Sequence, residues 1–169
     1  MRLNKFKFVK KTFLFIFFIL LCSNILAQQQ TVLDGLYLDE NKGAIRICPD
    51  SLKWNDTKPP LPPGAKVAVL EGNPKESGHF TIRIKMPPNY KIPPHMHPVD
   101  ERATVLSGAI YVGIGDTLDV AKAKKISAGC FYLNPAGMHH YAFTGKDETI
   151  LQISTNGPWG STYLQTTEH

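Results

Sequence analysis

The chain has 169 residues, about the length of one domain, so a second independent hydrophobic core is not expected. Lysine and arginine number 19 against 14 acidic residues, and five of these cations but no acid lie in residues 1–27. Residues 28–169 therefore hold 14 charges of each sign. This balance gives no support for nucleic acid or an anionic membrane surface as a partner.

Residues 1–27 have the pattern of a secretory signal peptide, with a basic start and an apolar run that begins at Thr12. The run of about 15 apolar residues is shorter than the roughly 20 that a spanning helix needs. We therefore expect cleavage after Ala27, export to the periplasm or the extracellular space, and no membrane attachment of the remaining chain. Retention as a helix and lipidation of Cys22 are alternatives, although Leu21 stands where lipidation requires a small residue.

Residues 28–63 lack a functional motif and are expected to form an N-terminal arm that packs on the main domain. One short strand is expected at residues 44–48, where apolar and polar residues alternate. Four prolines between Lys58 and Gly64 predict an irregular connection from this arm to the domain at residues 64–166.

Cys48 and Cys130 are the two cysteines left after removal of the leader, in a compartment that permits disulfides. We expect both to be buried, reduced and structural, because Cys130 lies in an apolar strand pattern. A disulfide within the chain or between two chains is the alternative.

Short strand patterns follow one another through residues 64–166. Phe80, Ile82 and Ile84 alternate with polar residues, which predicts a strand at 79–86 with one buried face and His79 at the surface. A short helix or helical turn is expected at 116–123, with Asp116 as its N-cap. Many short strands and almost no helical periodicity predict an all-β sandwich or barrel. The other strands are expected at 66–71, 102–107, 109–114, 131–133, 140–143, 149–154 and 161–164.

The segment from Pro93 to Glu101 concentrates residues that bind metals. His95 and His97, two positions apart, would project from the same face of a strand, with their imidazoles close enough to share one ion. Pro98 cannot donate to a strand ladder, so the strand should end there and Glu101 should begin a second strand that returns beside the first. Glu101 would then supply a third ligand to the same ion.

A second cluster runs from Gly129 to His140. Pro135 and Gly137 predict a turn, and the two histidines at positions 139 and 140 open the strand that follows. Because neighbouring side chains on a strand point to opposite faces, only one of these histidines can face inward.

The two clusters resemble the paired motifs of the cupin superfamily: HxHxxxE, six residues and Gly108, then Gly129, five residues, PxG, two residues and His. The resemblance covers roughly residues 87–144 and implies a cupin-type double-stranded β-helix, or jelly-roll barrel. Asn89 stands where the first motif usually opens with Gly, and Thr144 where the second usually closes with Asn. We expect small local differences there and no loss of metal. The metal ligands that the resemblance implies are His95, His97, Glu101 and His140.

Three neutral imidazoles and one carboxylate suit a divalent transition metal, and Fe, Mn, Ni, Cu and Zn all remain candidates. Four protein ligands in an octahedral site leave two positions for O2 or for a chelating substrate. The first hypothesis is metal-dependent, dioxygenase-like chemistry on a small molecule. The alternatives are a non-catalytic cupin that binds or senses a small ligand, and a metal that only stabilises the barrel. Homodimer formation also stays open.

An enzyme needs an acid, a base or a substrate-clamping group beside the metal. The candidates, none at a diagnostic spacing, are Tyr111, Tyr132, His139 and Arg102.

Overall fold

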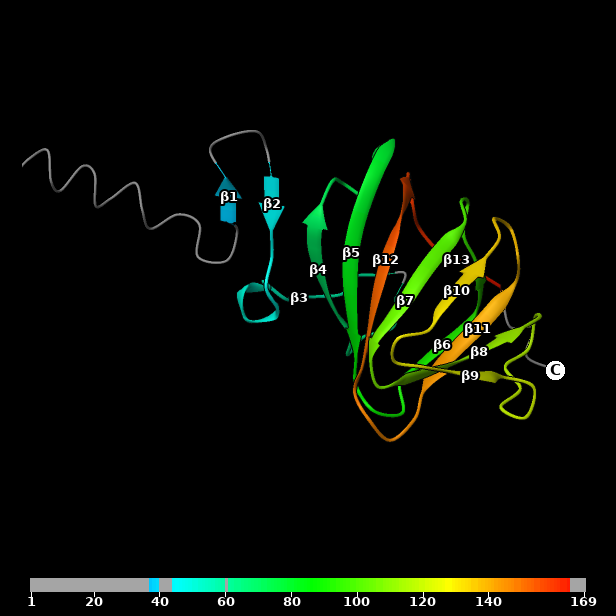
Figure 1. Ribbon diagram of the computed structural model, residues 1–169. Helices are drawn as coiled ribbons and strands as arrows, with labels where there is room; N and C mark the ends of the chain where they lie inside the picture. Colours follow the sequence, from blue (N-terminus) through cyan, green and yellow to red (C-terminus); the bar gives the residue numbers. More distant parts are fainter. Residues whose placement is uncertain (1–36, 40–43, 60, 165–169) are drawn as a thin grey trace, which may run out of the picture. The chain divides into compact units, whose positions relative to one another are not determined.

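The computed structural model describes residues 37–39, 44–59 and 61–164, so the predicted signal peptide lies outside the described residues (Figure 1). The chain divides into two compact units, residues 1–52 and 53–169. In the first unit, β1 (Tyr37–Asp39) pairs antiparallel with β2 (Ala44–Arg46), and the 3-10 turn η1 (Pro49–Ser51) follows. The strand predicted at 44–48 thus ends at Arg46, because Pro49 begins the turn. The packing of the arm on the barrel stays a prediction.

The second unit consists of two facing antiparallel sheets (Figure 1). No α-helix occurs in the described ranges, which confirms the predicted all-β, cupin-type fold. The six-stranded sheet has the spatial order β10 (Phe131–Asn134), β7 (Glu101–Ser107), β12 (Thr149–Gly157), β5 (Gly78–Met86), β4 (Lys66–Glu71) and β3 (Asn55–Asp56). The five-stranded sheet has the order β13 (Thr162–Tyr163), β6 (Lys91–Met96), β11 (His140–Thr144), β8 (Ala109–Ile114) and β9 (Lys124–Ser127).

The core lies between the two sheets, where every second residue of each strand points inward. Phe80, Ile82 and Ile84 of β5 are buried, as predicted, and they belong to one cluster with Ile110 of β8 and Ala142 of β11. Burying an aliphatic or aromatic side chain of this size contributes about 1.5–3 kcal/mol, so the alternation of β5 stabilises the sandwich strongly.

Gly108 lets the chain pass from one sheet to the other. It joins β7 of the six-stranded sheet to β8 of the five-stranded sheet with a φ of +70°, which favours glycine. A Cβ atom here would lie 2.4 Å from the carbonyl oxygen of Glu148 and 2.7 Å from the hydroxyl of Thr149. Any other residue would therefore push this crossover away from β12.

Of the short helix or helical turn predicted at residues 116–123, only a turn is present and no helix forms. The segment forms bends and one turn, in which the N–H of Lys122 donates to the carbonyl of Asp119 at 3.2 Å. Asp119 also accepts the N–H of Ala121 at 2.9 Å, while Asp116, the expected N-cap, pairs with His139 instead. A segment this short gains little from helix propensity without an apolar face to bury.

The prediction that both cysteines are buried is also wrong, because Cys48 and Cys130 are exposed free thiols. Cys130 lies in the turn before β10, where its N–H donates to the carbonyl of Ser127 and its own carbonyl accepts the N–H of Val105. The strand pattern begins one residue later, at Phe131.

The sequence pattern missed β9 (Lys124–Ser127), which pairs only with β8 at the edge of its sheet. Three of its four residues are exposed, so it lacks the hydrophobic alternation that identifies a half-buried strand. Within the described ranges, no helix has the length and hydropathy needed to span a bilayer.

Candidate metal centre

The five-stranded sheet supplies all three predicted histidine ligands. His95 lies in β6, His97 follows the last residue of β6, and His140 opens β11 directly opposite His95 in the strand pairing. Glu101 opens β7, as predicted, but β7 pairs with β10 and β12 and does not return beside β6. The chain crosses between the sheets after Met96, so the carboxylate reaches the histidines from the facing sheet.

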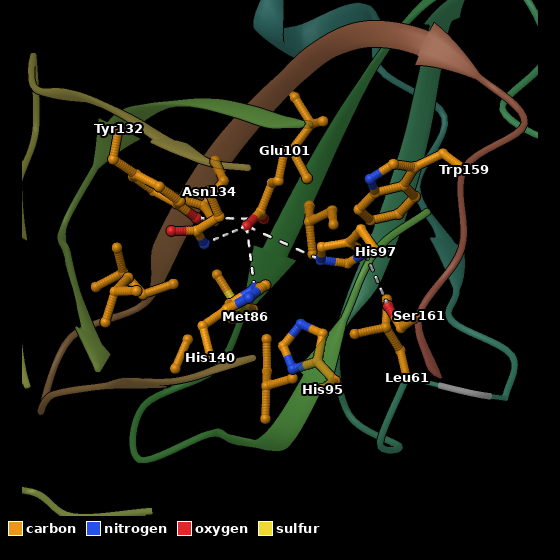
Figure 2. Close-up of a pocket in the computed structure, with 17 residues that line it drawn as sticks. Leu61, Met86, His95, His97, Glu101, Tyr132, Asn134, His140, Trp159 and Ser161 are labelled. Atoms are coloured by element: carbon orange, nitrogen blue, oxygen red, sulfur yellow. Dashed lines mark hydrogen bonds and ion pairs between the residues drawn. The ribbon is translucent and has the colours of Figure 1, made fainter. Parts of the chain in front are cut away.

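The four side chains meet in the interior of the sandwich (Figure 2). One ring nitrogen from each histidine lies within 4.8 Å of the others, so the three could hold one metal ion. Oε2 of Glu101 lies 3.3 Å from Nε2 of His140 and 3.9 Å from Nε2 of His97. All four residues are at most 6% exposed.

The backbone fixes which nitrogen of each imidazole carries a proton. Each Nδ1 lies within hydrogen-bond distance of a carbonyl oxygen: 2.8 Å for His95 to Pro93, 2.7 Å for His97 to Gly160 and 2.9 Å for His140 to Met138. A carbonyl only accepts, so Nδ1 must donate, and in a neutral ring Nε2 keeps a free lone pair. Metal-binding histidines typically have this arrangement.

The Nε2 atom of His97 provides an independent test of the fit. It is buried and has no hydrogen-bond partner among the described residues. A buried polar atom without a partner costs about 1–3 kcal/mol, which an ion accepting its lone pair would remove. The donor set therefore fits a divalent transition metal.

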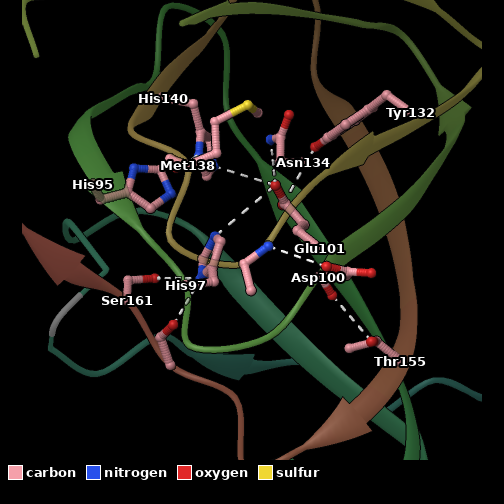
Figure 3. Close-up of polar contacts among 12 residues, drawn as sticks. His95, His97, Asp100, Glu101, Tyr132, Asn134, Met138, His140, Thr155 and Ser161 are labelled. Atoms are coloured by element: carbon pink, nitrogen blue, oxygen red, sulfur yellow. Dashed lines mark hydrogen bonds and ion pairs between the residues drawn. The ribbon is translucent and has the colours of Figure 1, made fainter. Parts of the chain in front are cut away.

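Glu101 is held by two residues of β10 (Figure 3). Nδ2 of Asn134 donates to Oε2 at 2.7 Å, and the hydroxyl of Tyr132 donates to Oε1 at 3.4 Å. The pairing of β10 with β7 places Asn134 directly opposite Glu101. The carboxylate is thus oriented toward the histidines before any ion binds.

The pKa shifts at Glu101 and Tyr132 reinforce this arrangement. Burial acts to raise the pKa of Glu101, but the hydrogen bond from His140, the charges of His97 and His140, and the bond from Asn134 lower it below its ordinary value. Burial and the Glu101 charge raise the pKa of Tyr132 well above its usual range. At neutral pH the carboxylate is therefore ionised and the phenol remains a donor.

The histidines differ in their proton affinity. Burial lowers the pKa of His95 to about 4, aided by the charge of His140, and burial also lowers the pKa of His97. Burial acts to lower the pKa of His140 too, but its bond and charge interaction with Glu101 raise the net pKa above 6.5. His140 therefore holds its proton to a higher pH than His95 and His97 do.

Hydrogen bonds join the two sequence motifs directly (Figure 3). In the PxG turn, the N–H of Gly137 donates to the carbonyl of His97 at 2.9 Å, and Oδ1 of Asp100 accepts the N–H of Ala136 at 3.0 Å. Thr155 anchors the carbonyl of Asp100 from β12 at 3.0 Å. The turn that precedes His140 is therefore built onto the segment that carries His97.

The two departures from the motif pattern lie at one corner of the fold. Asn89 adopts a φ of +57°, the left-handed conformation that glycine and asparagine tolerate best. The hydroxyl of Thr144 accepts the N–H of Tyr90 at 2.8 Å and donates to the carbonyl of Pro87 at 2.7 Å. These substitutions leave β6 and β11 bonded to each other next to the site.

Of the four acid–base candidates, only Tyr132 lines the pocket. His139 turns outward, with its Nδ1 2.7 Å from Oδ1 of Asp116. Tyr111 stacks on Phe143, with ring centroids 4.9 Å apart, and Arg102 donates to Asp100 at 2.6 Å. Tyr111, His139 and Arg102 therefore do not line the metal pocket, and His139 faces outward, as expected once His140 is the inward histidine.

Three residues that shape the site have no assigned role in the sequence analysis. The indole of Trp159 stacks on the ring of His97, with centroids 4.7 Å apart, and the carbonyl of Gly160 holds Nδ1 of the same histidine. Asn134 could have been found by its position two residues after Tyr132 and just before the PxG turn. Trp159 carries no such signal, because it lies about 60 residues away in an irregular segment and reaches the site only through the fold.

The cavity enclosed by the ligands is small. Its volume is about 20 Å³, and its walls include Tyr132 and Asn134 on one side and Leu61 and Trp159 on the other (Figure 2). A single water molecule needs roughly 10–15 Å³ by the same measure. The site in this conformation has room for an ion and little more.

Comparison with known proteins places this geometry in a family. The profile of the ChrR cupin-like domain family matches residues 42–159. Germin-like protein 5-1 of Oryza sativa subsp. japonica is 34% identical over 101 residues, which is 59% of this chain and 45% of that protein. Germin-like protein 9-3 of the same plant is 32% identical over 75 residues, 44% of this chain and 35% of that protein. The matches thus span less than half of each plant protein.

Solved structures agree on the fold. The polyketide cyclase RemF from Streptomyces resistomycificus superposes with a TM-score of 0.58 at 18% identity, covering 72% of this chain and 87% of that one. Lactobacillus farciminis oxalate decarboxylase gives 0.52 at 19% identity, covering 70% of this chain and 35% of that one. Because the family profile spans both histidine motifs and most of the chain, the protein belongs to the ChrR cupin-like domain family within the cupin superfamily.

Proposed function

We propose that the protein binds one divalent transition metal, either Fe, Mn, Ni, Cu or Zn, through His95, His97, Glu101 and His140. The observation that carries this proposal is the orientation of the three imidazoles. Each Nδ1 points to a backbone carbonyl, which leaves the Nε2 lone pairs beside a buried, ionised carboxylate. Nitrogen and oxygen donors in this ratio suit all five metals.

We further propose metal-dependent, dioxygenase-like chemistry on a small molecule. A metal held by these four residues would supply Lewis-acid or O2 chemistry to a small molecule. The chain's own contribution is to hold Glu101 through Asn134, to keep the Tyr132 hydroxyl protonated as a donor, and to surround the donors with apolar side chains. Met86, Ile110 and Ile153 line the same cavity and exclude water.

A second candidate is a non-catalytic cupin that binds or senses a small ligand. The 20 Å³ cavity does not choose between the two candidates, because neither an organic substrate nor an organic ligand fits beside the histidines without movement of the surrounding side chains. Tyr132 is also the one tyrosine among the described residues that line this cavity. The similar folds named above include a cyclase and a decarboxylase, so the fold does not choose the reaction.

Metal analysis of protein purified without a chelating resin tests the centre. We expect about one ion per chain in the natural protein. His97→Ala should lose the ion, whereas His139→Ala should retain it, since His139 bonds to Asp116 outside the cavity. Equal metal content in these two variants would refute the assignment.

Oxygen consumption separates the two candidate functions. The Fe(II)-loaded protein should consume O2 in the presence of one member of a panel of small organic acids and diketones, and the His97→Ala variant should not. A ligand that binds to the metal-loaded protein without any O2 uptake would favour the non-catalytic function.

We also propose that residues 1–27 are removed on export and that the protein acts in the periplasm or outside the cell. The support is the basic start and the apolar run of the sequence. Mass spectrometry of protein from the native host should find Gln28 at the N-terminus. Intact Met1 in the exported fraction would contradict this.

A further inference from the structure

A second cavity of about 170 Å³ lies beside the metal cavity. Its floor is the inner face of β4 and β5, where Val67 pairs with Ile84 and Val69 with Ile82. None of the residues that line it in the described chain belongs to the five-stranded sheet. Loop residues line this side of the cavity instead, namely Thr57, Lys58, Leu61 and residues 159–161. Val69, opposite Ile82 in the strand pairing, is 53% exposed.

The two cavities share a wall made of four residues, Leu61, Ile84, Trp159 and Ser161. Figure 2 shows Leu61, Trp159 and Ser161 on the same side of the metal cavity as His97. Trp159 stacks on His97, and its neighbour Gly160 accepts the hydrogen bond from Nδ1 of that ring. Anything that fills the larger cavity therefore touches the residues that orient a predicted metal ligand.

The lining of the larger cavity selects a type of molecule. Its body is apolar, formed by Leu61, Val67, Ile82, Ile84 and Trp159. A cavity of about 150 Å³ with an aliphatic lining takes up benzene, so one six-membered ring or a branched chain of similar size fits here.

The polar groups of the same cavity favour a negative charge on that molecule. Lys58 and Lys75 are exposed at the lining, and neither has an ion-pair partner among the described residues. No aspartate or glutamate lines the cavity. In addition, Nε1 of Trp159 is a buried donor without a partner, which an oxygen atom could satisfy.

We propose that this cavity binds a small organic anion with an apolar body about the size of one benzene ring, held by Lys58 and Lys75 and in contact with Trp159. Its role as the substrate or effector pocket of the metal centre rests on the function proposed above. The binding itself does not, because it depends on residues outside the metal ligands.

Benzoate and neutral benzyl alcohol are suitable probes, because they have the same ring and differ in charge. The chain has two tryptophans, so Trp54→Phe leaves Trp159 as the reporter. Trp54 lies under the ammonium group of Lys85 and does not line the cavity. We expect benzoate to change the Trp159 emission in a saturable way, with and without metal, and to bind more tightly than benzyl alcohol.

Charge-removing variants test the recognition of the anion. Lys58→Gln combined with Lys75→Gln should weaken benzoate binding about fivefold, the size expected for two solvent-screened charges, and leave benzyl alcohol unaffected. Lys91→Gln combined with Lys124→Gln is the matched control, because both lysines are exposed and neither lines the cavity. Val67→Phe should fill the cavity and weaken both probes.

The outcomes separate this proposal from the metal proposal. Saturable benzoate binding by a protein that takes up no metal would refute the metal centre and support the anion site. Absence of a saturable response, or equal benzoate affinity in the two double variants, would overturn the anion site. A Trp159 signal that responds to protein dilution but not to benzoate would indicate that a second copy of the chain occupies this cavity. That result would also overturn the anion site.

Discussion

His139 and His140 are neighbours in the sequence, and each lies close to a carboxylate oxygen: 2.7 Å from Asp116 and 3.3 Å from Glu101, respectively. The side chain of His140 is 2% exposed and that of Glu101 is 9% exposed, whereas the outer pair is 36% and 73% exposed. The two contacts therefore differ more in solvent exposure than in distance. Because water screens the outer pair, its contribution to stability is expected to be close to zero.

The inner pair follows different physics. Removing two charges from water costs free energy unless the pair has a fixed geometry and other groups satisfy the remaining hydrogen bonds of both charges. Asn134 and Tyr132 complete the partners of Glu101, and the carbonyl of Met138 orients His140. A histidine beside a carboxylate is therefore a candidate ligand when the fold buries the pair and supplies the remaining hydrogen-bond partners of both residues.

Replacement of the buried carboxylate should have the largest effect. Glu101→Gln removes the negative charge that faces the histidines, while its amide oxygen can still accept the hydrogen bond from Nδ2 of Asn134. We expect metal affinity to fall by about 1,000-fold or more, roughly 4 kcal/mol. The loss of a charged ligand should cost more affinity than the loss of a residue that only bonds to a ligand. Competition with a chelating dye measures the affinity. Glu148→Gln, an exposed change, should leave it unaltered, and a similar loss in both variants would contradict the inner role of Glu101.

Acid should destabilise the metal-free protein through the inner histidines. The folded state keeps His95 neutral down to about pH 4, while the unfolded chain binds its proton near pH 6.5. The unfolded state thus holds more protons between these pH values, so stability falls as the pH falls through this window. At pH 4, His95 alone should lower the free energy of unfolding by about 3 kcal/mol relative to pH 7.

Urea unfolding of the metal-free protein at pH 7 and at pH 4 measures this change. His97 adds to it in the same direction, because burial lowers its pKa as well. His140, with its pKa raised, stabilises the fold at low pH and loses this contribution above pH 6.5. The variant His95→Leu should show a weaker dependence on pH, and an unchanged dependence would refute the assignment to His95.

Loss of the group that orients the carboxylate should have a smaller effect. Asn134→Ala removes the 2.7 Å hydrogen bond to Oε2 of Glu101 but leaves all four predicted ligands in place. We expect metal affinity to fall about 10- to 100-fold, as for other partners of metal ligands. Isothermal titration calorimetry with the metal is the measurement. Asn156→Ala, at an exposed position of β12, should bind metal as the natural protein does.

The outer pair should have the smallest effect. Asp116→Asn removes the charge that faces His139, and we expect the free energy of unfolding to change by less than about 0.5 kcal/mol. Metal content should stay at the natural level. A large loss of stability or of metal would show that the contrast between the two histidines does not depend on burial.

Local patterns in the sequence predicted most of the strands, although not β9, and the histidines that gather in the interior. The alternation of Phe80, Ile82 and Ile84 predicts β5, and the histidine motifs predict which side chains gather in the interior. These predictions hold because strand geometry relates neighbouring residues directly. No helix forms at residues 116–123, where the expected N-cap residue Asp116 bonds instead to His139, a partner that the local pattern does not reveal.

The sequence alone determined the all-β class through residue types at short spacings, and its resemblance to the cupin motifs implied the inward choice of His140. The tertiary structure decided that Glu101 approaches from the opposite sheet, that Asn134 orients it, and that Trp159 covers His97. It also decided where the apolar cavity lies. These features depend on how two sheets of unequal width pack together, and no spacing within one strand contains that information.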